Sequence, residues 1–185
     1  MKKLCGLFFA AILSLAVICG CSSQNNGDST PKLSEEDIYI NTLNNALVSF
    51  SDCADALSTS LQEISDTTKI PSETQLDKIS AAVTDLSDVC ARIQAIEAPA
   101  KYTQAAAELS DAMQKYTSAL QKCTELLNFY REFDSKIREY DDPVKGSKEL
   151  TPKATEIYNE FASQLQQATA AFNSACQSIE QVRTA

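Results

Sequence analysis

Residues that break helices are confined to a few places along most of this chain. Beyond residue 33 the sequence contains one glycine, Gly146, and four prolines, Pro71, Pro99, Pro143 and Pro152. Because proline and glycine are the strongest local breakers of regular structure, four long segments remain between them. We expect helices near residues 34–67, 72–97, 100–141 and 152–183, each rich in the good helix formers Ala, Leu, Gln, Glu and Lys.

Apolar residues recur at alternating intervals of three and four within these segments. In the first they are Ile40, Leu43, Leu47, Phe50, Ala54, Leu57, Leu61 and Ile64, and in the third Tyr102, Leu109, Tyr116, Cys123, Tyr130 and Ile137 repeat at intervals of seven. This spacing is typical of the seams of antiparallel bundles and coiled coils, and short links make neighbouring helices antiparallel. The sequence therefore predicts an all-α, antiparallel up-down four-helix bundle over residues 34–185, with an elongated third helix.

Two of the predicted helices have recognisable starts. Ser34 offers an N-cap hydroxyl and is followed by three acids, Glu35, Glu36 and Asp37, which the helix dipole favours in a first turn. Thr151 precedes Pro152, a residue suited to the first helical position. We therefore expect helices to begin at residues 34 and 152.

The N-terminus has the charge-then-hydrophobic order of an export signal. Lys2 and Lys3 precede about sixteen apolar or small residues, too few for a membrane span, which takes roughly 20. The run ends in Ile18, Cys19, Gly20 and Cys21, which resembles the lipobox of bacterial lipoproteins, although Ile18 stands where leucine is usual and Cys19 where a smaller residue is usual. The resemblance implies that residues 1–20 are a signal peptide and that Cys21 is acylated with palmitate-like chains. Secretory cleavage without lipid is the alternative.

The residues after Cys21 are small and polar, with no apolar period. We interpret residues 21–33 as a lipidated, flexible, disordered tether with a reach of roughly 20 Å. Acylation would supply the hydrophobic anchor to the membrane. The predicted location is the cell envelope, on the outer face of the cell membrane or on the outer membrane, according to the type of envelope.

The charge balance restricts the partners. Loss of residues 1–20 removes two lysines and leaves 14 Lys and Arg against 25 Asp and Glu, a net charge of about −11. Nucleic acids and anionic lipid surfaces are disfavoured because their phosphates require basic side chains. A soluble, non-adhesive surface is the simplest interpretation, with cationic partners as the alternative.

Four cysteines remain after processing: Cys53, Cys90, Cys123 and Cys176. An even number of cysteines in an exported domain favours disulfides, and their wide spacing disfavours a zinc site. With the segments stacked up and down, a rise of about 1.5 Å per residue favours Cys53–Cys90 and Cys123–Cys176. The same rise per residue places Cys90 and Cys123 more than about 20 Å apart, too far for a disulfide. A Cys53–Cys176 bond across the first and fourth helices stays open as an alternative.

The residues needed for most enzymatic sites are missing. The sequence has no histidine, no Gly-x-Ser-x-Gly elbow and no glycine-rich phosphate loop, and paired cysteines would leave no nucleophilic thiol. Glu156 and Glu160, four residues apart, either hold a cation or belong to a solvated helix face. We therefore expect no enzyme, no cofactor and no metal.

Aromatic residues are concentrated where the long third segment should extend beyond the end of the first helical hairpin. We expect residues after about Leu126 to project, carrying the candidate partner-binding residues Phe129, Tyr130, Phe133, Ile137, Tyr140 and Tyr158. A local aromatic core is the simpler explanation, and a partner-binding tip at residues 126–161 is the functional one. The sequence thus predicts a lipid-anchored binding or scaffolding module of the envelope, its partner an envelope protein or a small ligand. The alternative is a sensory or solute- and cation-binding lipoprotein with a site between helices.

Overall fold

The computed structural model describes residues 33–64 and 71–185. In these ranges the elements are α2 (Glu35–Glu63), α3 (Glu73–Gln94), the short 3-10 turn η1 (Ala100–Tyr102), α4 (Thr103–Arg138) and α5 (Pro143–Thr184). The described ranges contain no strand, so the prediction of an all-α fold is confirmed. The predicted signal peptide and all but the last residue of the predicted tether lie outside them. None of the described helices is long and apolar enough to cross a membrane.

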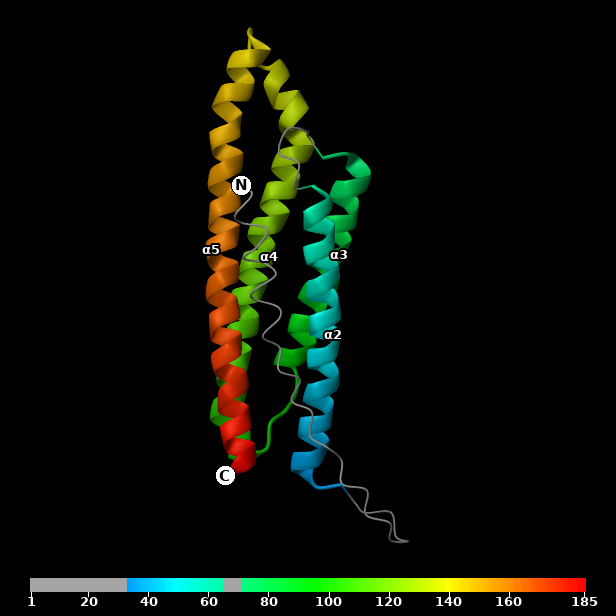
Figure 1. The fold of residues 1–185 in the computed structure, drawn as a ribbon, viewed down its shortest axis with the longest axis vertical. Helices are drawn as coiled ribbons and strands as arrows, with labels where there is room; N and C mark the ends of the chain where they lie inside the picture. Colours follow the sequence, from blue (N-terminus) through cyan, green and yellow to red (C-terminus); the bar gives the residue numbers. More distant parts are fainter. Residues whose placement is uncertain (1–32, 65–70) are drawn as a thin grey trace.

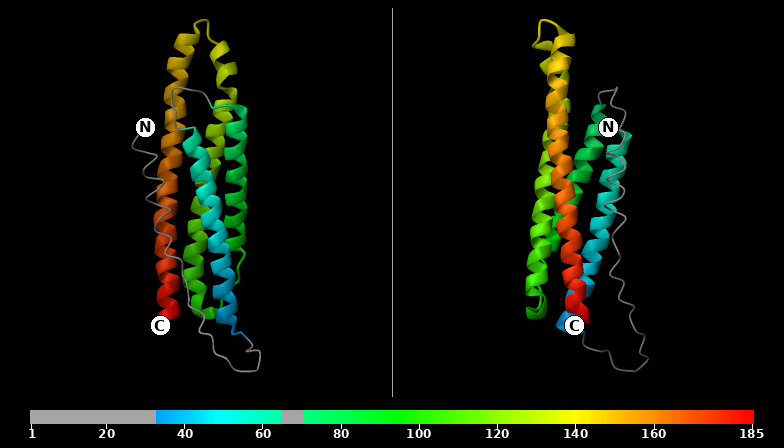
Figure 2. Two further views of the ribbon diagram at one scale, coloured as in Figure 1. Left: turned by 45° about the vertical axis from the view of Figure 1, so that its right-hand side comes forward. Right: turned by 60° about the vertical axis from the view of Figure 1, so that its left-hand side comes forward.

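The four long helices lie alongside one another in an elongated arrangement. Successive helices run in opposite directions (Figure 1). The start of α2 and the C-terminus lie at one end, and the turn between α4 and α5 lies at the other, beyond the ends of α2 and α3 (Figures 1 and 2). The molecule therefore has a basal end, where the chain enters α2, and a distal end formed by the α4–α5 hairpin alone.

The first helix begins where the sequence predicts. The Ser34 hydroxyl accepts a hydrogen bond from the backbone N–H of Asp37 at 3.0 Å, and the Asp37 carboxylate accepts one from the backbone N–H of Ser34 at 3.2 Å. This reciprocal capping box satisfies two donors that the first helical turn would otherwise leave unpaired. The same arrangement, made by Ser72 and Gln75, starts α3.

The last helix begins nine residues earlier than predicted. Asp142 is its N-cap, with the carboxylate accepting from the backbone N–H of Val144 at 2.9 Å, and Pro143 takes the first helical position. Pro152 lies inside the helix, and Thr151 donates its hydroxyl proton to the carbonyl of Ser147 at 2.8 Å instead of capping. The predicted start at residue 152 was wrong because proline is tolerated inside a helix when its lost hydrogen bond is offset by tertiary packing.

An aromatic cluster crosses the middle of the main core. The Phe50 ring of α2 stacks on Phe172 of α5 with centroids 5.1 Å apart, and meets Tyr116 of α4 edge-on at 5.0 Å. The buried hydroxyl of Tyr116 bonds Thr169 of α5 at 2.9 Å. Because Thr169 also donates to the carbonyl of Leu165, its single proton is committed there and Tyr116 is the donor to Thr169. These contacts fix the relative heights of α2, α4 and α5.

Candidate functional site at the distal end of the α4–α5 hairpin

An ion-pair group on α3 and α4 marks where the projecting part of the hairpin begins. The Arg131 guanidinium lies 2.8 Å from a carboxylate oxygen of Asp77 and 3.5 Å from one of Glu73, both in the first turns of α3. Residues of α4 up to Arg131 are therefore level with α3, and only those beyond it project. The projection starts about five residues later than the sequence count suggested.

The distal end has a small core of its own. Phe129, Phe133, Leu150 and Ala154 are buried together, and Ile137, Tyr140 and Ile157 pack against them. The Phe129 and Phe133 rings lie tilted to each other with centroids 6.0 Å apart. Because α5 already begins at Pro143, Leu150 and Ala154 are helical and cover the α4 aromatics. We call these seven residues the tip core.

The six candidate partner-binding residues do not form a single exposed patch. Phe129 and Phe133, each 9% exposed, are in the tip core, with Ile137 and Tyr140 at its margin. Tyr130 and Tyr158 pack against the main core instead, and Tyr158 meets Phe161 with ring centroids 6.5 Å apart. The simpler interpretation, a local aromatic core, therefore describes where these side chains lie.

The turn between α4 and α5 closes around a glycine. The Tyr140 ring lies on Gly146, where an added Cβ would come within 2.8 Å of Tyr140 Cδ2 and 2.9 Å of its Cγ. Burial and the nearby Glu149 carboxylate raise the pKa of the Tyr140 phenol. Val144 stands beside this contact at the first turn of α5 and is 63% exposed, the most exposed large hydrophobic residue of the described chain. An apolar side chain is thus presented to solvent on a turn that is closely packed underneath.

Charged side chains surround the tip. The Lys136 ammonium lies 5.0 Å above the Phe129 ring centroid and 2.7 Å from the Glu132 carboxylate. Lys145 lies 3.9 Å from Glu149 across one turn of α5. Such exposed pairs contribute little to stability. Lys145 directly follows Val144 in the sequence, so one charged pair of the tip lies next to the exposed apolar side chain.

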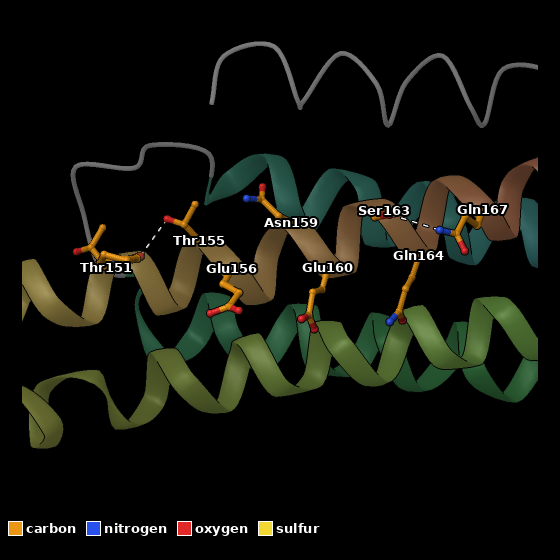
Figure 3. A pocket seen from close by; sticks show the side chains of 9 residues that line it. Thr151, Thr155, Glu156, Asn159, Glu160, Ser163, Gln164 and Gln167 are labelled. Carbon is orange, nitrogen blue, oxygen red and sulfur yellow. Dashed lines mark hydrogen bonds between the residues drawn. The ribbon is translucent and has the colours of Figure 1, made fainter.

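A groove runs along α5 below the tip. Its described lining comes from this helix alone: Thr151, Pro152, Thr155, Glu156, Asn159, Glu160, Ser163, Gln164 and Gln167. Figure 3 shows Glu156, Glu160 and Gln164 pointing toward α4, whereas Thr155 and Asn159 point away from it.

At the Glu156–Glu160 pair, one of the two carboxylates is already paired with a lysine. The Lys122 ammonium lies 2.8 Å from the Glu160 carboxylate and 2.8 Å from that of Glu125. Hydrogen bonds to these two carboxylates raise the pKa of Lys122, so the ammonium stays charged. Within residues 33–64 and 71–185, no three potential metal-binding side chains come together. These observations favour the interpretation of Glu156 and Glu160 as part of a solvated face.

The four cysteines of the helical domain are free thiols in this structure, so neither predicted disulfide, Cys53–Cys90 nor Cys123–Cys176, is present in it. Burial raises the pKa of Cys90 and of Cys123 to about 12 and that of Cys176 to about 11. At neutral pH these thiols are protonated, and a protonated thiol is a poor nucleophile and a poor metal ligand.

The predicted Cys123–Cys176 bond is wrong. Lys122 on α4 contacts Glu160 on α5, whereas Ser178 on α5 donates to Glu108 on α4 at 2.6 Å. Cys123 is therefore level with residue 161, and Cys176 with residue 110 or so. The two lie roughly 20 Å apart along the helix axes, well beyond the span of a disulfide. The error follows from the start of α5, which shifts its pairing with α4.

A polar contact at the basal end was not predicted. Tyr102 is fully buried, and its hydroxyl donates to the Glu36 carboxylate at 2.6 Å, while the Lys101 ammonium lies 3.2 Å from the same group. The Tyr102 hydrogen bond, followed by that from Lys101, lowers the pKa of Glu36. The Tyr102 and Tyr39 rings pack with centroids 5.1 Å apart. In the sequence, Tyr102 is visible only as one member of the seven-residue apolar repeat, so its polar partner could not be foreseen.

Comparison of the chain with protein-family models, with curated proteins and with solved structures finds no significant match in any of the three.

Proposed function

We propose that this chain is a lipid-anchored, extracytoplasmic binding or scaffolding module of a bacterial cell envelope that acts by contact and not by catalysis. Residues 1–20 serve as its signal peptide, Cys21 carries the lipid, and residues 21–33 form a tether. Residues 34–185 then constitute an up-down four-helix bundle domain. The contact surface in this proposal is the α4–α5 turn around Val144.

One observation carries the proposal: the α4–α5 hairpin projects beyond its neighbours and is internally packed. Its tip core buries Phe129 and Phe133, while its turn exposes Val144. A hairpin without a second function would be expected to end level with α2 and α3, because the projecting turns gain no contact with them. The projection points away from the end at which the chain enters α2 (Figure 1). A lipid attached upstream of α2 would hold this turn far from its own membrane.

The alternative of a solute- or cation-binding lipoprotein has less support. The groove on α5 has its described lining on one helix, and Glu160 is already paired with Lys122. A carboxylate neutralised in this way has less electrostatic attraction left for a cation. We therefore do not assign a ligand to this groove.

The proposal is tested by photo-crosslinking in the cell of origin. A photoreactive residue replaces Val144, and the same residue replaces Val48 of α2 as a control, since both valines are apolar and exposed, at 63% and 54%. We expect a discrete adduct from position 144 that is absent from position 48. Failure to capture anything at 144, or equal capture at both positions, would refute the binding role of the turn. Fractionation of a Cys21→Ala variant tests the anchor separately, with release from the membrane fraction as the expected result.

A further inference from the structure

The four free cysteines are not equivalent in their reach to one another. Cys123 is excluded from bonding Cys176 by the pairing of α4 with α5 described above. Cys53 and Cys176 belong to α2 and α5, which are aligned by the Phe50–Phe172 stack. Cys53 lies three residues after Phe50 on α2, and Cys176 lies four residues after Phe172 on α5. Because α2 and α5 run in opposite directions, these displacements add to seven residues. The two cysteines are therefore roughly 10 Å apart along the helix axes, more than a disulfide spans.

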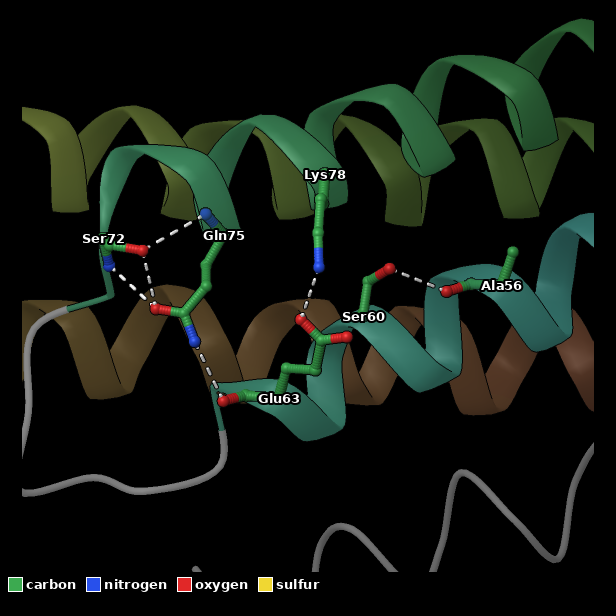
Figure 4. Close-up of polar contacts among 6 residues, drawn as sticks. All are labelled: Ala56, Ser60, Glu63, Ser72, Gln75 and Lys78. Carbon is green, nitrogen blue, oxygen red and sulfur yellow. Dashed lines mark hydrogen bonds and ion pairs between the residues drawn. The ribbon is translucent and has the colours of Figure 1, made fainter.

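Contacts between α2 and α3 bring Cys53 and Cys90 to neighbouring heights. At the distal end of this pair, the Lys78 ammonium lies 3.2 Å from the Glu63 carboxylate, and the Gln75 side-chain amide donates to the Glu63 carbonyl at 3.2 Å (Figure 4). Counting from this point, Cys53 lies 10 residues down α2, and Cys90 lies 12 to 15 residues down α3. At about 1.5 Å per residue the two cysteines differ in height by roughly 3–8 Å.

The electrostatic surroundings of Cys53 agree with this alignment. The charges of Asp85 and Arg92, both on α3, act on the Cys53 thiol in opposite directions. Their joint influence places Cys53 opposite the stretch of α3 that contains Cys90. After burial, the nearby Cys53 thiol is the next cause that raises the pKa of Cys90 to about 12.

A bond from Cys90 to Cys176 is disfavoured by the same geometry. α3 packs against α2 and α4, and α5 packs against α4. Gln94 of α3 donates to the carbonyl of Ser110 on α4 at 3.1 Å, which places Cys90 near the level of Tyr116. Cys176, level with residue 110 or so, lies more than a turn away along the helix axes.

We propose that Cys53 and Cys90 form the single disulfide of the helical domain, joining α2 to α3, and that Cys123 and Cys176 remain thiols. In the cell this bond rests on the proposed export, since exported domains meet an oxidising compartment. The bond ties together the shorter α2–α3 hairpin and leaves the α4–α5 hairpin without a covalent link.

The oxidant is a disulfide-containing molecule, such as glutathione disulfide or a dithiol oxidoreductase. Cys53 is half-buried and Cys90 is fully buried, so Cys53 is the thiol that the oxidant reaches. The Cys53 thiolate attacks one oxidant sulfur and releases the other as a thiolate. Cys90, after losing its proton, then attacks the Cys53 sulfur and displaces the second oxidant sulfur. Two protein thiols and one oxidant disulfide thus become one protein disulfide and two oxidant thiols, with two electrons transferred to the oxidant.

Peptide mapping tests the assignment directly, because trypsin places each cysteine on its own peptide. The peptides are residues 33–69 for Cys53, 79–92 for Cys90, 123–131 for Cys123 and 154–183 for Cys176. The purified domain is equilibrated with glutathione disulfide, denatured in iodoacetamide without reductant and digested. We expect peptide 33–69 linked to peptide 79–92, with peptides 123–131 and 154–183 each carrying one alkyl group. Four alkylated peptides, or any link that includes peptide 123–131 or 154–183, would overturn the proposal.

Two variants keep the test independent of export and of folding defects. Cys176→Ser should retain the link, whereas Cys53→Ser, which changes a half-buried residue, should leave Cys90 alkylated. A reductant should lower the midpoint of thermal unfolding of the oxidised wild type and of Cys176→Ser, but not that of Cys53→Ser. If the link forms in vitro but is missing from protein isolated from the cell, the export proposal fails while the geometric assignment stands.

Discussion

Replacement of Phe133 by alanine should open the distal end of the hairpin while the rest of the domain stays folded. Phe133 is 9% exposed and belongs to a tip core separate from the main core. Truncation of a buried phenylalanine to alanine costs about 3–5 kcal/mol. Because the tip core contains only four buried residues, we take the lower limit of about 3 kcal/mol, which corresponds to a change of roughly a hundredfold in the local opening equilibrium.

Native-state hydrogen exchange measures this equilibrium segment by segment. In Phe133→Ala, amides of residues 129–150 should lose about a hundredfold in protection, whereas amides in the first half of α4 should change little. The matched control is Phe161→Ala, since Phe161 is fully buried in the main core. That variant should lower protection throughout the domain. If Phe133→Ala lowers protection as uniformly as Phe161→Ala does, the tip core is not an independent unit and the reasoning is refuted.

Three further predictions follow from individual contacts. Thr169→Val should lower the free energy of unfolding by about 1–3 kcal/mol, because it leaves the buried Tyr116 hydroxyl without a hydrogen-bond partner. Tyr116→Phe should lower it by only about 1 kcal/mol, because Thr169 keeps its hydrogen bond to the Leu165 carbonyl. Chemical denaturation of both variants tests this order, and the reverse order would contradict it. Gly146→Ala should destabilise the α4–α5 turn, because overpacking against Tyr140 costs about 1–3 kcal/mol whereas the gain in helix propensity is about 1 kcal/mol. In a Tyr140→Ala background the same change should be neutral or stabilising, because the overpacking is then removed. Because folding lowers the pKa of Glu36, its contribution to the free energy of unfolding is present above the ordinary pKa of 4.5 and is lost as the pH falls through the folded-state pKa. Glu36→Gln should therefore flatten the acid limb of a stability–pH profile. An unchanged acid limb would show that the tyrosine and lysine contacts to this carboxylate do not stabilise the fold.

Local signals in the sequence were sufficient for the helical class and for the start of the first helix. The 3-4 apolar spacing along residues 40–64 corresponds to side chains that lie inside the main core or pack against it. Ser34 and Asp37 form the capping box that a serine followed by acids indicates. Both features depend only on residues close together in the sequence.

The start of α5 required information that is not local. Thr151 followed by Pro152 is a valid N-terminal signal, and so is Asp142 followed by Pro143. Which one operates depends on whether residues 143–151 gain enough from packing on α4 to remain helical. In the structure Leu150 provides that packing by covering Phe133 in the tip core.

This choice also decided the outcome at the candidate site. With α5 starting at 152, Leu150 would lie in a loop and the α4 aromatics would lack a cover, so an exposed aromatic patch was a reasonable expectation. With α5 starting at 143, the aromatics are buried and Val144 becomes the exposed apolar side chain. The same shift moves Cys176 away from Cys123. A nine-residue error in one boundary thus accounts for both differences.

The central claim is that the domain is held at its basal end and makes contact at its distal end. Energy transfer from a donor on the lipidated protein to an acceptor lipid in the membrane tests it, with the donor at Ile38 or at Val144, both exposed. Val144 stands 40 residues, or roughly 60 Å, from the basal end of α5. We predict strong transfer from Ile38, weak transfer from Val144, and the loss of both in Cys21→Ala. Equal transfer from the two positions, or transfer that survives Cys21→Ala, would contradict the account.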